Sequence, residues 1–310
     1  MYIVDSHCDS IARVADGTYG LVNPYNFSEK HPQLQFVALF TAWEKVSPEE
    51  ARRLAVEYIG HFHIAMEKEK NKVLWVRSYG EIERAFSEGK HAALLTLESG
   101  TALMGSTELL RDFHAAGIRV MGLTWLTNDL AKSNRLADGE EDTGLTDVGR
   151  EIVREGNRLG MIFDVSHASD RTFWDLAELS EKPIIATHSN FRSLCGHTRN
   201  LTDEMAREII RRDGVIGLNL CRSFIHEDEA KKTAENLFRH LDHALELGGE
   251  DHIGFGCDID GIGGDYPPPL TEERSIHDQL IEKMLRKNYS ESLIRKVAGE
   301  NHLAFLKKYL

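Results

Sequence analysis

The chain has 310 residues, of which 41% are hydrophobic and 28% are charged, and its net charge at pH 7 is −13. This composition is typical of a globular protein with a sizeable core, and the negative charge argues against a nucleic-acid or anionic-membrane partner. No apolar run approaches the roughly 20 residues of a membrane span. The first ten residues lack the basic start of a signal peptide, and the four cysteines lack paired CxxC spacing. We therefore expect a cytoplasmic protein with free thiols.

Short apolar runs rich in β-branched residues alternate along the chain with amphipathic segments. Most of these runs are continuously apolar, which is typical of strands that are covered on both faces. A further run at 73–76 is interpreted as part of a connection. The predicted strands span residues 2–4, 34–40, 92–97, 118–124, 161–166, 183–187, 215–220 and 253–257.

Several of the segments between these strands carry helix boundary signals. Ser47 is a plausible N-cap with Pro48 at the first helical position, and Gly160 ends a later helix just before a strand. The polar segment 134–147 is expected to be a long loop near the site. Strands alternating with helices predict an α/β fold, a (β/α)8 TIM barrel that forms one domain over residues 1–310. The predicted helices with such signals span 47–70, 146–160, 201–214 and 233–249.

Polar side chains with metal-binding chemistry follow most of the predicted strands. Because catalytic groups of a parallel barrel come from the carboxyl ends of its strands, these side chains should meet at one rim. Any one of them alone is more often a capped or solvated residue, but accidental positions would scatter over both rims. The set comprises His7, Asp9, Glu98, His167, His188 and Asp258.

Imidazole and carboxylate ligands together suit zinc and similar divalent ions. Two histidines and one carboxylate would hold one ion, and this set is large enough for two ions that share a carboxylate. On a strand, positions i and i+2 point to the same side, so His7 and Asp9 can turn inward while Cys8 points away. His61 and His63 lie in a helical segment, where that spacing does not share a face.

Other candidate donors are given structural roles. His240 and His243 lie on an amphipathic helix away from the strand ends, so we expect them to pack in the core or on the surface. Thiolate ligation by Cys8 or Cys257 is a less favoured alternative, because each thiol should face away from the neighbouring candidate.

Five stretches of the chain together point to a known family. They are DSHCD (5–9), LTLESG (95–100), GLTDVGREIVREGNRLGMIFDVSHAS (144–169), ATHSNFRSLCGHTRNLTDE (186–204) and IGFGCDIDG (253–261). In this order they resemble the membrane (renal) dipeptidase family of zinc metallopeptidases. The resemblance implies an amidohydrolase-like TIM barrel with a binuclear zinc site, for which manganese and cobalt are alternatives. It also implies a dipeptide substrate and, as in many relatives, a homodimer.

The resemblance assigns the two metal ions to two sets of ligands that share one glutamate. Glu98 would bridge the ions. The first set is His7, Asp9 and Glu98, and the second is Glu98, His167 and His188.

Three further positions can be compared with the family pattern. Asp258 matches the catalytic acid/base, which also contacts the substrate amine, and Arg199 matches the arginine that binds the substrate's terminal carboxylate. One position departs, because Trp125 stands where animal-type members have a histidine that stabilises the tetrahedral intermediate. Its indole has a single N–H donor, so this departure bears on substrate range and rate more than on reaction class. Trp125 is interpreted as core packing, as a wall on the substrate side that binds substrate, or as both.

The implied reaction is hydrolysis of a peptide bond by a hydroxide that bridges two zinc ions. Asp258 would pass the proton of the attacking water to the amine, and Arg199 would clamp the carboxylate. Fixing both chain ends selects dipeptides, L,D-dipeptides among them. Three alternatives stay open. The first is a hydrolase of another amide, such as an N-acyl amino acid, or of a lactone. The second is a phosphoesterase or nuclease, and the third is a non-enzymatic barrel that binds zinc or a peptide.

Overall fold

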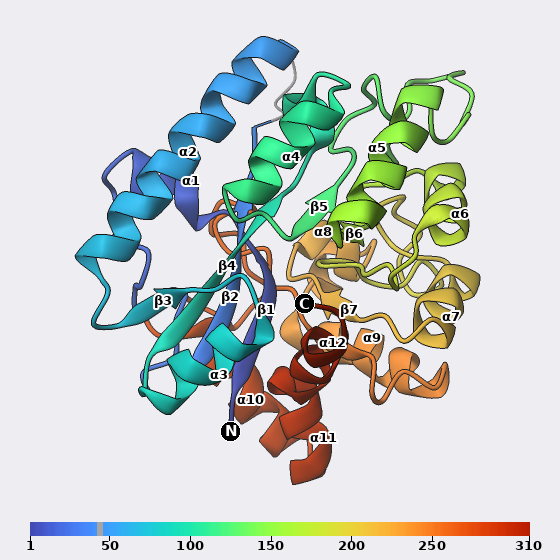
Figure 1. Cartoon of the computed structure of the whole chain (residues 1–310). Coiled ribbons are helices and arrows are strands. Elements are labelled where there is room, and N and C mark those ends of the chain that lie inside the picture. The colour runs from blue at the N-terminus through green and yellow to red at the C-terminus, as the bar shows by residue number, and fades with distance from the viewer. Residues whose placement is uncertain (42–45) are drawn as a thin grey trace.

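The computed structural model describes residues 1–41 and 46–310 (Figure 1). At its centre lies a curled parallel sheet with the strand order β6-β5-β4-β2-β1-β8-β7. Buried apolar side chains cover these strands, as their continuously apolar sequences predict. The strands are β1 (Ile3–Cys8), β2 (Gln33–Leu39), β4 (His91–Leu97), β5 (Val120–Gly122), β6 (Ile162–Asp164), β7 (Ile216–Leu218) and β8 (Ile253–Phe255).

Residues 184–187 close the ring between β6 and β7 without forming a regular strand. Ile185 pairs with Asp164 of β6, and Ala186 pairs with Ile216 of β7, each through one parallel bridge. With this segment the chain forms a (β/α)8 barrel, which confirms the predicted fold class. All eight predicted runs therefore contribute to the ring, although the sixth does so only through bridges.

The interpretation of residues 73–76 as part of a connection was wrong. They contain β3 (Val73–Trp75), which pairs in parallel with the amino-terminal half of β4. The reason lies in β5, which pairs with β4 only at Thr96 and Leu97. The first half of β4 is left with a free edge on that side, and β3 satisfies its backbone groups.

Helices surround the sheet (Figure 1). Two of the predicted helix boundaries are present in the structure. The hydroxyl of Ser47 accepts a hydrogen bond from the backbone of Glu50, and Gly160 ends its helix in the left-handed conformation. The helices are α1 (Ser10–Ala15), α2 (Pro48–Lys68), α3 (Tyr79–Ser87), α4 (Thr107–Ala115), α5 (Asp147–Leu159), α6 (Asp170–Leu179), α7 (Asp203–Arg211), α8 (Arg222–Ile225), α9 (Ala234–Glu246), α10 (Ile276–Arg286), α11 (Glu291–Arg295) and α12 (Asn301–Tyr309).

Short turns complete the secondary structure. Two are 3₁₀ turns, at Gly100–Leu103 and Glu229–Lys231, and Lys296–Glu300 forms a π turn between α11 and α12. Within residues 1–41 and 46–310, none of the helices combines the length and the apolar character that crossing a membrane would need.

Candidate functional site

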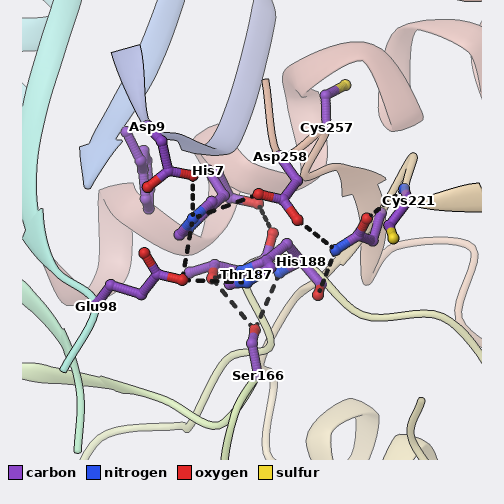
Figure 2. A network of polar contacts seen from close by, with 12 residues as sticks. His7, Asp9, Glu98, Ser166, Thr187, His188, Cys221, Cys257 and Asp258 are labelled. Carbon is purple, nitrogen blue, oxygen red and sulfur yellow. Dashed lines mark hydrogen bonds and ion pairs between the residues drawn. The ribbon is translucent and has the colours of Figure 1, made fainter. Parts of the chain in front are cut away.

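The six polar side chains predicted to share a rim do come together. Figure 2 shows His7, Asp9, Glu98, His188 and Asp258 close to one another. The six come from the carboxyl ends of five parts of the barrel, since His7 and Asp9 share the end of β1, and all except Asp258 are buried. His7 was predicted to follow the first strand, but it lies within β1. The pairing register of β1 shifts between Asp5 and Cys8, where His7 is located. Asp9 precedes α1, Glu98 follows β4, His167 follows β6, His188 follows residues 184–187, and Asp258 follows β8.

One oxygen of Glu98 lies close to all three imidazole rings. Oε1 lies 3.1 Å from Nε2 of His167, 3.7 Å from Nε2 of His7 and 3.9 Å from Nε2 of His188. The Nε2 atoms of His167 and His188 are 3.0 Å apart, and Oδ2 of Asp9 lies 3.4 Å from Nε2 of His7. The donors thus form two overlapping triplets, His7–Asp9–Glu98 and Glu98–His167–His188. These are the groupings that the family resemblance implies.

The chemistry of these donors fits divalent cations. Nε2 of His7, Oδ1 of Asp9 and Oε2 of Glu98 are buried without a hydrogen-bond partner among the described residues. Such atoms are costly to bury unless another group satisfies them. Burial alone would lower the pKa of His7, but the charges of Glu98 and Asp9 raise that pKa to about 10. This part of the site therefore favours a positive charge, which a bound cation would supply.

Thr187 determines which nitrogen of His188 carries the proton. Its Oγ1 lies 2.5 Å from Oδ2 of Asp164 and 2.7 Å from Nδ1 of His188. A carboxylate can only accept, so the hydroxyl donates to Asp164 and accepts from Nδ1–H of His188. Nε2 of His188 is then unprotonated and faces Glu98, as a metal ligand must.

Two glycines allow Thr187 to approach its neighbours closely. A side chain at Gly217 of β7 or at Gly256 after β8 would collide with the carbonyl oxygen of Thr187. The backbone that carries His188 can therefore pack directly against the ends of these strands.

Electrostatics also favours neutral imidazoles at this position. Burial, together with the positive charges of Arg199 and His7, lowers the pKa of both His167 and His188 well below the usual range. Neutral imidazole is the form that binds metal ions.

Asp258 lies beside the two triplets in an uncommon backbone conformation. Its φ is 59°, which is unusual for a residue other than glycine. Nδ2 of Asn219 donates to its Oδ2 at 3.0 Å, while its Oδ1 lies 4.0 Å from Nε2 of His7. Burial raises the pKa of Asp258 to about 6, close to the range in which a carboxyl group can exchange protons. Asp258 also forms a triplet with His7 and His188, so the geometry allows a ligand role as well.

A cavity of about 360 Å³ opens over these donors. Its volume lies at the small end of ligand pockets, so it suits a small molecule. Its lining includes Asp9, Glu98, His167 and Asp258 on the side of the donors, the apolar Phe40, Trp125, Phe224 and Ile262, and the cations Arg13, Arg135 and Arg199.

Arg199 is a buried cation in this lining, not a surface arginine. Its Nη2 donates to the carbonyl of His188 at 3.1 Å, its Nη1 donates to the carbonyl of Ser166, and the guanidinium lies 5.2 Å from the ring centre of Phe224. A guanidinium has five N–H groups, so donors remain for an anion in the cavity.

Trp125 forms part of the cavity wall. Its ring centre lies 5.0 Å from that of Phe40 and 6.1 Å from that of His167. The guanidinium of Arg135 lies over the Trp125 ring, 4.2 Å from the ring centre. The predicted loop 134–147 thus does reach the site, through Arg135.

The thiols of Cys8 and Cys257 are not among the donors of the two triplets. Cys8 packs in the apolar core, and in Figure 2 the sulfur of Cys257 points away from the carboxylates and imidazoles. The structure therefore gives no support to thiolate ligation at this site.

Sequence reasoning missed a second set of residues that support the donors. His277 received no role, yet it is buried, and its Nε2 lies 2.7 Å from Oδ2 of Asp5. Oδ1 of Asp5 accepts from the backbone N–H groups of His7 and Cys257, which joins the ends of β1 and β8. A usable signal was the alternation Asp5, His7, Asp9, which places all three on one side of a strand.

The model of the family described as membrane dipeptidase (peptidase family M19) matches residues 1–309. A protein of Klebsiella pneumoniae, encoded in the 5′ region of pqqA and without an assigned function, is 33% identical over 237 residues, which cover 74% of this chain and 86% of that protein. The dipeptidase tcpJ of Claviceps purpurea is 30% identical over 243 residues, which cover 78% of this chain and 57% of the fungal protein.

Two solved structures share the fold over the whole chain. A metallopeptidase from Rhodobacter sphaeroides, bound to a phosphinate mimic of the dipeptide L-Ala-D-Ala, is 25% identical with a TM-score of 0.88, and the match covers 100% of this chain and 99% of that one. The dipeptidase AC, a metallopeptidase of family M19, is 27% identical with a TM-score of 0.87, and the match covers 100% of this chain and 98% of that one.

Proposed function

This chain belongs to the membrane dipeptidase family, and from that premise we propose that it is a metal-dependent dipeptidase. The observation that carries the proposal is the convergence of two donor triplets on Glu98, beneath a cavity that the buried Arg199 lines. The dipeptide mimic bound by the Rhodobacter sphaeroides enzyme supports the class of substrate.

Two divalent ions would occupy the two triplets, with Glu98 shared between them. Nitrogen and oxygen donors of this kind suit zinc, and manganese or cobalt could take its place. When bound, such a pair of ions supplies an activated water and polarises the carbonyl of the scissile bond.

Asp258 would move the proton that hydrolysis requires. Because Asn219 already donates to Oδ2, the free oxygen is Oδ1, which faces His7. This atom would accept a proton from the attacking water and return it to the departing amine.

Arg199 would fix the other end of the substrate. Its remaining N–H groups can hold a terminal carboxylate, and burial strengthens that charge-assisted contact. A ligand that must reach both Arg199 and Asp258 is limited in length, and this limit favours dipeptides over longer peptides.

The decisive experiment combines metal analysis of the purified protein with a panel of dipeptides. We expect two ions per chain and hydrolysis of L,L- or L,D-dipeptides, with their N-acetylated forms cleaved more slowly. The Glu98→Gln variant should lose metal and activity together. Faster cleavage of the acetylated compounds, or of a lactone, would instead favour the alternative hydrolase, and a single closed metal site would favour a structural role for the ion.

Two expectations from the sequence stay predictions. We propose a cytoplasmic location, which the four free cysteines support, and cell fractionation would test it. The expected homodimer can be tested by analytical ultracentrifugation of the metal-loaded protein.

A further inference from the structure

Arg135 is an exposed cation in the lining of the cavity. Among the residues that the structure describes, no carboxylate lies within ion-pair distance of its guanidinium. Other charged residues of the lining have partners: Arg13 lies 3.9 Å from Asp260, and Asp265 accepts from Arg222 at 2.8 Å. The charge of Arg135 is therefore available to a ligand.

The backbone that carries Arg135 is anchored to the donor side of the site. The N–H of Asn134 donates to the carbonyl of His167 at 3.0 Å, and Nδ2 of Asn134 donates to the carbonyl of Ser166 at 3.2 Å. Ser133 pairs with Ala168 through an antiparallel bridge. These contacts fix the base of the Arg135 side chain relative to the donors, as a recognition residue requires.

The ring of Trp125 then directs the guanidinium over the cavity. Arg135 lies 4.2 Å from its centre, and such stacking leaves the N–H edge of the guanidinium free to bind an anion. Trp125 thus supports the guanidinium of Arg135 in the cavity lining.

Arg135 and Arg199 both line the cavity, and the charge of Arg135 acts on Arg199. Burial lowers the pKa of Arg199 to about 10, and the charge of Arg135 acts in the same direction. The Arg135 charge also adds to the effect of burial in lowering the pKa of His197, which is two residues from Arg199. Two cations, Arg135 and Arg199, therefore line the cavity that Asp258 also lines.

We propose that Arg135 recognises a second carboxylate, the side chain of a C-terminal aspartate or glutamate, while Arg199 holds the main-chain carboxylate. This inference rests on the proposed dipeptidase function and defines its preferred substrates. A charge-assisted hydrogen bond at a partly exposed site should raise kcat/KM for an acidic C-terminal residue by about tenfold.

The test compares Ala-Asp with Ala-Asn, which has the same shape without the charge, and with Ala-Ala and Asp-Ala, each in L,L and L,D forms. In the wild type, kcat/KM for Ala-Asp should exceed that for Ala-Asn by about tenfold. Arg135→Gln should reduce this ratio to about one. It should leave kcat/KM for Ala-Ala and Ala-Asn within about twofold of the wild-type values. Arg154→Gln, which removes the same charge from exposed α5 surface, should leave the ratio unchanged.

Calorimetry with phosphinate dipeptide mimics that end in aspartate or asparagine provides a second readout that does not depend on turnover. The wild type should bind the aspartate mimic about tenfold more tightly, and Arg135→Gln should bind both equally. An Arg135→Gln variant that keeps the preference, or that loses Ala-Ala activity to the same extent, would overturn the inference while the dipeptidase function stands. A preference for Asp-Ala would overturn the assignment to the C-terminal residue. If no dipeptide is cleaved, the proposed function fails, and the inference falls with it.

Discussion

The hydroxyl of Thr187 lies 2.7 Å from Nδ1 of His188 and is itself bonded to Asp164. This relationship links a carboxylate that is outside the donor triplets to a histidine within one of them. It fixes both the proton and the ring orientation of His188 before any ion binds, as outer contacts of metal-binding histidines commonly do.

Replacement of Thr187 by valine should therefore weaken metal binding without unfolding the barrel. Valine has a similar shape but no hydroxyl, so Nδ1 of His188 loses its acceptor, and we expect affinity for one ion to fall about 10- to 100-fold. Metal content after dialysis against graded chelator would measure the change. Thr187→Ser keeps the hydroxyl and should retain the ion. Equal retention in the valine and serine variants would show that this hydrogen bond does not support the metal.

Asp258→Asn should separate a catalytic role from a ligand role. If Oδ1 moves the proton, kcat should fall by about 10²- to 10⁴-fold while the protein keeps both ions and KM changes little. Metal analysis and steady-state kinetics on the same preparation would show this. Loss of one ion in the variant would instead assign Asp258 to the triplet with His7 and His188.

Arg199→Ala should raise KM for dipeptides and also lower stability. The carbonyls of Ser166 and His188 lose their donor, which should cost about 1–3 kcal/mol of unfolding free energy. The role in binding can be isolated by comparing each dipeptide with its C-terminal amide. The wild type should discriminate strongly between the two, whereas Arg199→Ala should treat them alike. Discrimination that survives in the variant would place the carboxylate elsewhere.

The barrel and its donors could be predicted because both leave regular signals in the sequence. Continuous apolar runs predict strands covered on both faces, and the rule that strand ends share a rim brings together residues as distant as His7 and Asp258. The run at 73–76 was misread, since whether it pairs depends on how little of β4 is covered by β5.

The residues that support the site were harder to predict, because tertiary contacts decide their roles. Nothing in the local sequence of Arg135 shows that Asn134 bonds to the strand end at His167, or that Trp125 lies beneath the guanidinium. His277 received no role from the sequence, and only the folded chain brings it to Asp5. Such pairings have no periodicity that a sequence pattern could reveal.

His240 gives a prediction for the dependence of stability on pH. It is fully buried on α9, its Nδ1 accepts from the backbone N–H of Phe191 at 3.2 Å, and its Nε2 donates to the carbonyl of Ile225 at 2.9 Å. Both ring nitrogens are thus satisfied only in the neutral form, in agreement with the packing role expected from the sequence. Burial lowers the pKa of His240 to about 4.

The pKa of His240 is lower in the folded state than the usual value of about 6.5. At pH values between these two pKa values, the unfolded chain therefore binds more protons than the folded one. The contribution to stability is therefore complete above about pH 6.5 and is lost as the pH falls towards 4, with a change of about 2 kcal/mol between pH 7 and pH 5. Urea unfolding of the wild type and of His240→Gln, at both pH values and with the same metal loading, would measure it. Glutamine can accept and donate but does not titrate, so the variant should lose about 2 kcal/mol less than the wild type on acidification. Equal losses would mean that His240 is not the group that links protonation to unfolding.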